Sequence, residues 1–247
     1  MAKKKESVQE FARRESARLK RDNGPMLTRW KVLWTPLLLL AIPVLAFSLP
    51  EIMAAAVSGR EERIAAAVSL LLSVVFFSFV PLLPVYVFGH EMTHWLAAKC
   101  FFRKTGKLTL KRASGALEVP GTNWVIVLAP YCFPLYFFIA AGICAFIALY
   151  VTPPQIIGGE ALFTAVPTLC YGYHLALTCR ALRHGQEDIR YCGGFFAAAA
   201  VTFGNLFFLY LTLIVSGALW QEAFRIPADK VTSAANWMLQ CVESLSH

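Results

Sequence analysis

Apolar residues form five long runs along this chain, and polar and charged residues are concentrated between them. The runs occupy residues 33–57, 64–102, 123–151, 160–182 and 191–219. A helix of about 20 residues crosses the hydrocarbon core of a bilayer, so each run is long enough for one transmembrane helix. The pattern therefore predicts an all-α polytopic membrane protein with about five transmembrane helices.

The second run is too long for one straight crossing, and it contains Pro81 and Pro84. Two prolines this close together break or kink a helix. The run could therefore form one bent crossing with an interfacial stretch, or two short crossings. The distribution of charge decides between these alternatives.

Basic residues are distributed unevenly among the segments between the runs. Residues 1–32 contain ten Lys and Arg, and residues 103–112 contain five. Basic loops remain on the cytoplasmic side of a membrane, so both segments are expected there. This expectation requires 64–102 to cross once. The economical topology has five crossings, with the N-terminus in the cytoplasm and the C-terminal segment outside.

These observations divide the chain into three regions. We expect a basic cytoplasmic tail at 1–32, a transmembrane domain at 33–220 and an extracytoplasmic segment at 221–247. Residues 228–245 repeat apolar side chains at helical spacing, which predicts a short amphipathic helix on the outer surface. The expected location is the cytoplasmic (inner) membrane of a bacterium, with the lipid bilayer as a partner.

One segment has the pattern of strands rather than helices. Within 103–122, residues 107–110 alternate between polar and apolar, and residues 113–115 form a turn signal before a second short apolar stretch. This pattern predicts a short β-hairpin at the cytoplasmic face.

Composition excludes several classes of protein. The chain is 57% hydrophobic and only 15% charged, whereas soluble domains have about half apolar and about a quarter charged residues. The net charge of +8 does not indicate nucleic-acid binding, because the charges follow the expected membrane topology. The seven cysteines are odd in number and form no C-x-x-C pair, so neither a disulfide framework nor a zinc ribbon is expected.

The strongest chemical signal is the sequence His90-Glu91-Met92-Thr93-His94. On a helix, His90 and His94 are one turn apart and face the same side, so both imidazoles can bind one metal ion. Glu91 lies beside them, where it can act as a general base. The surrounding residues are apolar, and ionisable groups at membrane depth are candidates for function.

A catalytic metal site needs a third protein ligand. Asp188 is favoured because it lies within the last basic turn, at 180–190, on the same side of the membrane as His94. His174 is the main alternative, because it precedes Arg183 by the same nine residues that separate His94 from Arg103. His174 could equally be a neighbour that orients the site. Two weaker competitors lie close to Asp188 in the sequence, His184 and Glu187.

Together, these features resemble the site-2 protease family of intramembrane zinc metalloproteases. The resemblance covers roughly residues 64–205 and consists of the His90–His94 motif, the hairpin, the following span and the later Asp near glycines. It implies Zn²⁺ held by His90, His94 and Asp188, with Glu91 as the base. The family also has an asparagine element before the next helix, which Asn123 matches only in part. Asn123 is therefore a candidate substrate-backbone or oxyanion donor, with a helix-cap role as the alternative.

The expected function is that of a zinc-dependent metalloendopeptidase, which cleaves membrane-protein substrates in or near their transmembrane segments. One alternative is another membrane metalloenzyme, such as a prenyl-protein protease, whose third ligand would be Glu187 or Glu160. The other alternative is a non-catalytic metal-binding scaffold or transporter. We expect no nucleic-acid partner.

Overall fold

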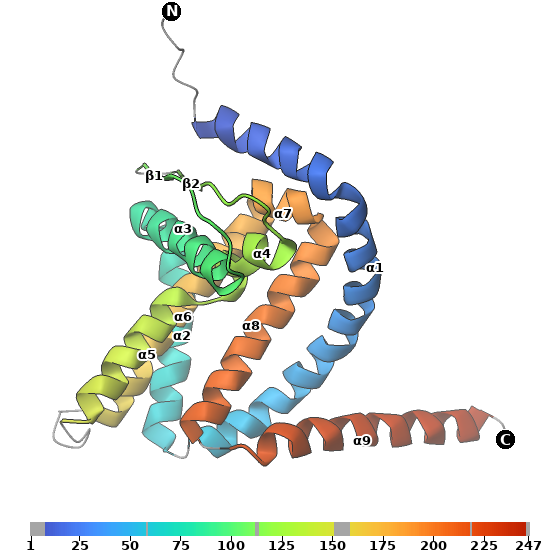
Figure 1. Cartoon of the computed structure of the whole chain (residues 1–247). Coiled ribbons are helices and arrows are strands. Elements are labelled where there is room, and N and C mark those ends of the chain that lie inside the picture. The colour runs from blue at the N-terminus through green and yellow to red at the C-terminus, as the bar shows by residue number, and fades with distance from the viewer. Residues whose placement is uncertain (1–7, 58, 112–113, 151–158, 218, 246–247) are drawn as a thin grey trace, which may run out of the picture.

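The computed structural model describes residues 8–57, 59–111, 114–150, 159–217 and 219–245, and within 8–28 it describes only the backbone. The predicted mostly helical class is confirmed (Figure 1). The helices are α1 (Val8–Ala56), α2 (Arg60–Phe79), α3 (Leu83–Cys100), α4 (Trp124–Cys132), α5 (Leu135–Ala148), α6 (Gly159–His184), α7 (Glu187–Cys192), α8 (Gly194–Gly217) and α9 (Glu222–Leu245). The strands are β1 (Leu108–Leu110) and β2 (Gly115–Leu117).

Three of the described helices are long and apolar enough to cross a membrane. They are α2, α8 and the part of α1 from Arg29 to Ala56. The pair α4 and α5 passes the same test when taken together, although it bends by 58° and is either a broken span or a re-entrant loop. The membrane class is therefore supported, with three or four candidate spans in the described chain. The predicted number of five is not established by length and composition.

Proline accounts for the two breaks in these apolar segments. The second apolar run separates into α2 and α3 at residues 80–82, as Pro81 and Pro84 predict. Leu82 there adopts a left-handed backbone conformation with φ of 37°. Pro134 caps α5 at the bend after α4. Each break turns the chain, so that α3 and α4 are short helices instead of parts of straight spans.

Close packing joins the long helices in pairs. α2 runs along α6, and α1 runs along α8. The hydroxyl of Ser73 in α2 donates a hydrogen bond to the carbonyl of Leu169 in α6 at 2.6 Å. A Cβ atom at Gly172 would lie 2.7 Å from the Ser73 Cβ, so glycine is needed at this crossing. Small residues allow such close helix contact inside membranes.

The two strands pair antiparallel within the segment that was expected to form a hairpin. Leu108 lies opposite Leu117, and Leu110 lies opposite Gly115. Residue 113 is the first of the predicted turn, and residues 112–113 lie outside the described residues. So do most of the predicted external loop at 152–159 and the first seven residues of the basic tail.

The elements that carry candidate chemistry gather at one end of the helix bundle. Figure 1 shows α3, α4, α7 and the two strands at this end, whereas α9 crosses the opposite end. A buried core of side chains from α1, α4, α7 and α8 lies behind the site and includes Leu38, Leu128, Tyr131, Cys192 and Ala197. This core holds α4 and α7 in fixed positions relative to each other.

Candidate metal centre

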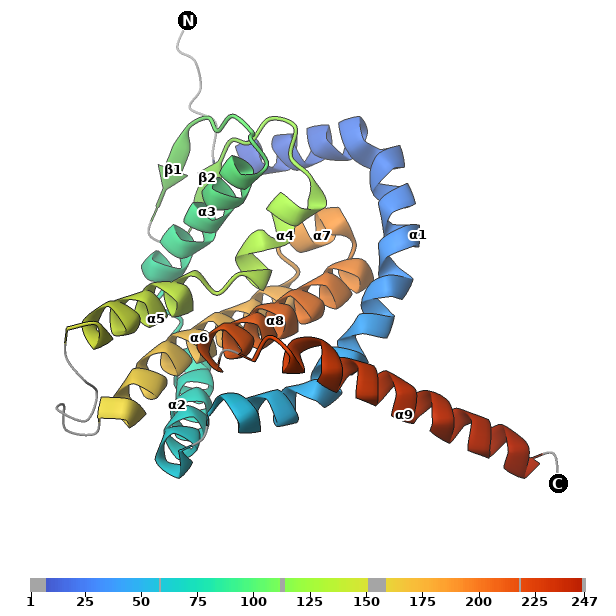
Figure 2. The same ribbon diagram turned by 60° about the horizontal axis from the view of Figure 1, so that its bottom comes forward.

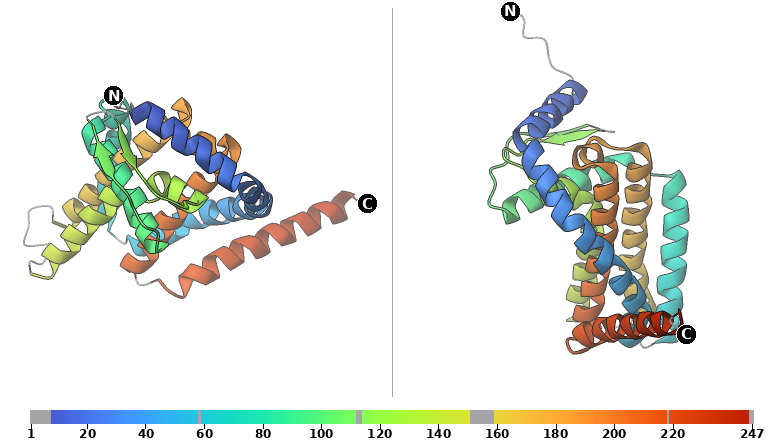
Figure 3. Two further views of the ribbon diagram at one scale, coloured as in Figure 1. Left: turned by 45° about the horizontal axis from the view of Figure 1, so that its top comes forward. Right: turned by 90° about the vertical axis from the view of Figure 1, so that its right-hand side faces the viewer.

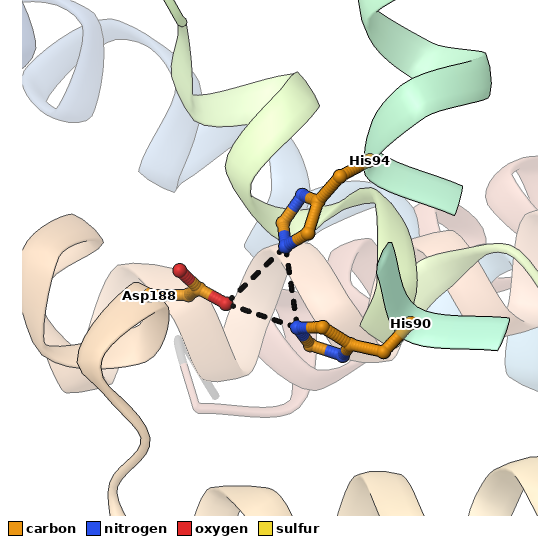
Figure 4. A group of neighbouring side chains, drawn as sticks. All are labelled: His90, His94 and Asp188. Atoms are coloured by element: carbon orange, nitrogen blue, oxygen red, sulfur yellow. Dashed lines mark hydrogen bonds and ion pairs between the residues drawn. The ribbon is translucent and has the colours of Figure 1, made fainter. Parts of the chain in front are cut away.

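Helix α3 positions the two histidines of the sequence motif. His90 and His94 are one turn apart, and their side chains are only 10% and 13% exposed. Their Nε2 atoms approach to 3.2 Å, and both face Asp188 (Figure 4). The helical spacing therefore brings two imidazole nitrogens to one point, as the sequence predicts.

Asp188 reaches this point from the first turn of α7, the short helix between α6 and α8. Its Oδ2 atom lies 3.3 Å from His90 Nε2 and 3.5 Å from His94 Nε2. Gly185 and Gly193 flank α7 with φ angles of 60° and 83°, values that favour glycine. The two glycines thus allow the tight reversals that carry Asp188 back over α3.

Within the described residues, His90, His94 and Asp188 are the group that could hold a metal ion, and their ligand atoms all lie within 4.8 Å of one another. Burial raises the pKa of Asp188, but its interactions with His90 and His94 outweigh burial and leave this pKa well below its ordinary value. The ionised carboxylate is the form that binds a metal ion.

A hydrogen bond to α4 sets the tautomer of His94. His94 Nδ1 donates to the backbone carbonyl of Ile126 at 2.9 Å. When the imidazole is neutral it carries one proton, and this bond then keeps that proton on Nδ1, so that Nε2 can bind a metal. The sequence motif predicts the histidine, but its backbone partner on another helix was not predicted.

Asn123 supports the same turn of α4. It is the N-cap of this helix, and its Oδ1 accepts a hydrogen bond from the Ile126 amide at 2.9 Å. The helix-cap interpretation is therefore confirmed. Asn123 also steadies the residue whose carbonyl holds His94, and its role as a substrate or oxyanion donor stays a prediction.

Glu91 is 6% exposed and is covered by β2. A Cβ atom at Gly115 would lie 2.5 Å from Glu91 Cγ and 2.6 Å from its Oε1. The backbone of the strand therefore rests directly on the carboxylate side chain. Glu91 is not among the residues that could hold a metal ion, and its role as a general base stays a prediction.

Two residues beside Asp188 were not predicted from the sequence. The Tyr131 hydroxyl lies 3.0 Å from Asp188 Oδ2 and 2.5 Å from Gln186 Oε1. Both oxygens are acceptors, and the hydroxyl shares its single proton between them. The Tyr131 ring packs at 5.2 Å from the His90 ring. Gln186 is two positions from Asp188, and Tyr131 is a phenol within an apolar run. Neither feature indicates by itself that the two side chains meet.

His174 does not belong to the ligand group. It lies on α6, and its Nε2 is buried without a hydrogen-bond partner among the described residues. The same is true of His90 Nδ1. Both histidines line one small pocket together with Tyr86, Tyr136 and Tyr173. His174 is therefore a neighbour of the group that could hold a metal ion and is not part of it.

The remaining sequence candidates also lie outside the group. Glu160, His184 and Glu187 contribute no atom to the cluster found within the described chain. Asp188 is thus the carboxylate that the structure places beside the two histidines.

No protein-family model, curated protein or solved structure matches the chain. A functional assignment therefore depends on the geometry of this site.

Proposed function

We propose that the chain is an intramembrane zinc metalloprotease similar to the site-2 protease family. Its substrates would be other membrane proteins, cleaved in or near their transmembrane segments. The observation that carries this proposal is the convergence of His90, His94 and Asp188, with Glu91 next to His90 on the same helix.

The spacing of the three ligand atoms suits zinc. Zinc binds imidazole nitrogen and carboxylate oxygen in a tetrahedron at about 2.0–2.1 Å, which separates neighbouring ligand atoms by about 3.3–3.4 Å. The corresponding distances here are 3.2, 3.3 and 3.5 Å. His90, His94 and Asp188 could therefore hold the ion with little movement. Three protein ligands also leave one position open, as in catalytic zinc sites.

The chain's own residues supply the remaining chemistry. Zinc, when bound, would act as a Lewis acid toward the scissile carbonyl. Glu91 would accept a proton from the attacking water and pass it to the leaving amine. The contact of β2 with Glu91 keeps the carboxylate in place and limits its access to bulk water.

The hairpin would present the substrate to the site. A helical peptide bond is shielded, so a transmembrane substrate must unwind before cleavage. An extended peptide can bind by adding a strand to a sheet edge. A strand added to β1 and β2 would run close to Glu91, because Gly115 of β2 contacts this residue.

The full topology belongs to the same proposal. We propose five crossings. They are the three candidate spans named above, the bent pair α4 and α5 as one crossing, and α6 as the fifth. The N-terminus would face the cytoplasm of a bacterium. The basic segment after α3 and the basic residues around α7 lie at the same end of the bundle as the start of α1, which supports this orientation (Figure 1).

The central experiment compares the wild-type protein with Glu91→Gln. Gln preserves size but accepts no proton, so the variant should keep one zinc ion per chain and lose cleavage. Zinc would be measured on the purified proteins, and cleavage by comparing membrane proteomes. Turnover of Glu91→Gln at the wild-type rate would remove the proteolytic mechanism. Full zinc content in the double variant His90→Ala/His94→Ala would remove the metal site.

The two alternatives give different results. A prenyl-protein protease-like site would use Glu187 or Glu160, whereas the ligand group contains Asp188. A non-catalytic scaffold would show the same membrane proteome for wild type and Glu91→Gln. In that case, only the ligand variants would change the phenotype.

A further inference from the structure

Helix α9 has apolar residues on one side and polar residues on the opposite side. Phe224, Val231, Ala235, Met238 and Val242 recur at intervals of three, four and seven residues and share one side of the helix. The opposite side carries the polar residues Arg225, Asp229, Asn236, Gln240 and Glu243. Such a helix matches a boundary between an apolar medium and water.

Only the first turns of α9 pack against the rest of the protein. Ile226 is buried with Ile52, Tyr210 and Ile214, which lie on α1 and α8. Lys230 forms an ion pair with Glu51 near the end of α1. These contacts fix the start of α9 against the ends of two candidate membrane spans.

The remainder of α9 leaves the bundle. All residues from 231 to 240 are exposed, and they include Met238 and Leu239 at 56% and 62%. Figure 2 shows α9 extending past α1 and away from the other helices. The apolar side of this part therefore has no covering element within the described chain.

The position of α9 indicates what contacts its exposed apolar side. The helix begins a few residues after Gly217, where α8 ends, and it contacts α1 close to Ala56, where that span ends. The ends of transmembrane helices lie at the membrane surface. Figure 3 shows α9 lying across the end of the bundle rather than along it. A helix at this level, running sideways, lies in the plane of the interface.

We propose that α9 is an interfacial helix that rests on the bilayer, with its apolar side in the lipid and its polar side in water. The exposed side chains of Val231, Met238 and Val242 would enter the boundary between headgroups and acyl chains. The proposal is independent of the metal site.

Charge indicates which lipids α9 would bind. The helix carries Arg225 and Lys230 against Glu222, Asp229 and Glu243. It therefore lacks the basic surface that attracts anionic headgroups. Burial of apolar area is the expected source of binding, so zwitterionic lipids should suffice.

The test uses the full-length chain in phosphatidylcholine nanodiscs, with the native cysteines replaced and the metal content checked. A nitroxide label would be placed at Val242 on the apolar side, or at Gln240 on the polar side as the matched control. Collision rates with oxygen, which concentrates in lipid, and with a water-soluble nickel chelate would then be measured. We expect oxygen to dominate at Val242 and nickel to dominate at Gln240. Anionic lipid should leave both results unchanged.

Two outcomes would overturn the proposal. Equal exposure of both sites to nickel would place α9 in water. Protection of Val242 from both reagents, with short label-to-label distances between copies, would assign the apolar side to a second copy of the chain.

Discussion

At the residue scale, the candidate site depends on side chains that orient the ligands as much as on the ligands themselves. His94 is held by the carbonyl of Ile126, and this turn of α4 is capped by Asn123. Asp188 is held by Tyr131. Partners of this kind set the direction and proton state of metal ligands. They therefore provide separate tests of the site.

Asp188→Ala and His174→Ala should have unequal effects on metal affinity. Loss of Asp188 removes one of three ligands, so we expect a decrease of more than about 100-fold and no activity. His174 only lines a pocket beside His90, so its loss should weaken binding by about 10-fold or less. Competition titration with a zinc chelator measures both. The reverse result would indicate a three-histidine site and a different class of protein.

Tyr131→Phe should lower metal affinity while leaving the metal ligands in place. The substitution removes the hydroxyl that contacts Asp188 and Gln186, and loss of such a partner costs about 10–100-fold in affinity. Tyr150→Phe is the matched control, because Tyr150 is 75% exposed and far from the ligand group. Equal zinc affinity in the two variants would show that the Tyr131 hydroxyl does not support Asp188.

At the element scale, the paired strands and the glycine-flanked α7 place further residues beside the two histidines of α3. β2 covers Glu91, and α7 brings Asp188 to the two histidines. Neither element is long enough to be stable alone. Each is positioned by helices that it packs against, including α3 for the strand and α4 for α7.

Gly115→Ala should impair catalysis without removing the metal. The added methyl group would lie 2.5 Å from Glu91 Cγ, so either the strand or the carboxylate must move. A displacement of about 1 Å at a catalytic group can cost about 100-fold in rate. Gly142→Ala is the control, because nothing lies within 4 Å of its added Cβ. Full activity in Gly115→Ala would show that Glu91 tolerates movement of β2.

At the scale of the whole molecule, the bundle has two ends with different roles. One end carries the candidate metal ligands, the two strands and α7, and α9 lies at the other end (Figure 1). A protease of this arrangement would receive water from the end that carries the candidate metal ligands. The orientation of the bundle in the membrane therefore determines which compartment supplies the water.

The topology can be tested by cysteine labelling from each side of the membrane. We expect residues 1–32 and 103–118 to face the cytoplasm and residues 221–247 to face the opposite side, because basic loops remain in the cytoplasm. A single cysteine at Lys107 should react with an impermeant reagent only from the cytoplasmic side, and one at Gln240 only from the other. Labelling of position 107 from outside would require two crossings within 64–102.

Helical periodicity and proline chemistry were sufficient to predict the local part of this structure. The spacing of His90 and His94 places both rings on one side of a helix, and Pro81 and Pro84 end the preceding helix. These features depend on residues that are near neighbours in the sequence. For the same reason, the mostly helical class could be predicted from the apolar runs.

The third ligand and its surroundings required the tertiary structure. Asp188 is 98 positions from His90 along the chain, and the sequence left His174 as an alternative. The choice depends on how the turn around α7 packs against α3 and α4, which no local pattern specifies. The contacts made by Tyr131, Ile126 and Gly115 arise in the same way, because each joins helices or strands that are distant in the sequence. Local spacing therefore determined two candidate ligands, and packing between elements determined the third and the groups that orient His94 and Asp188.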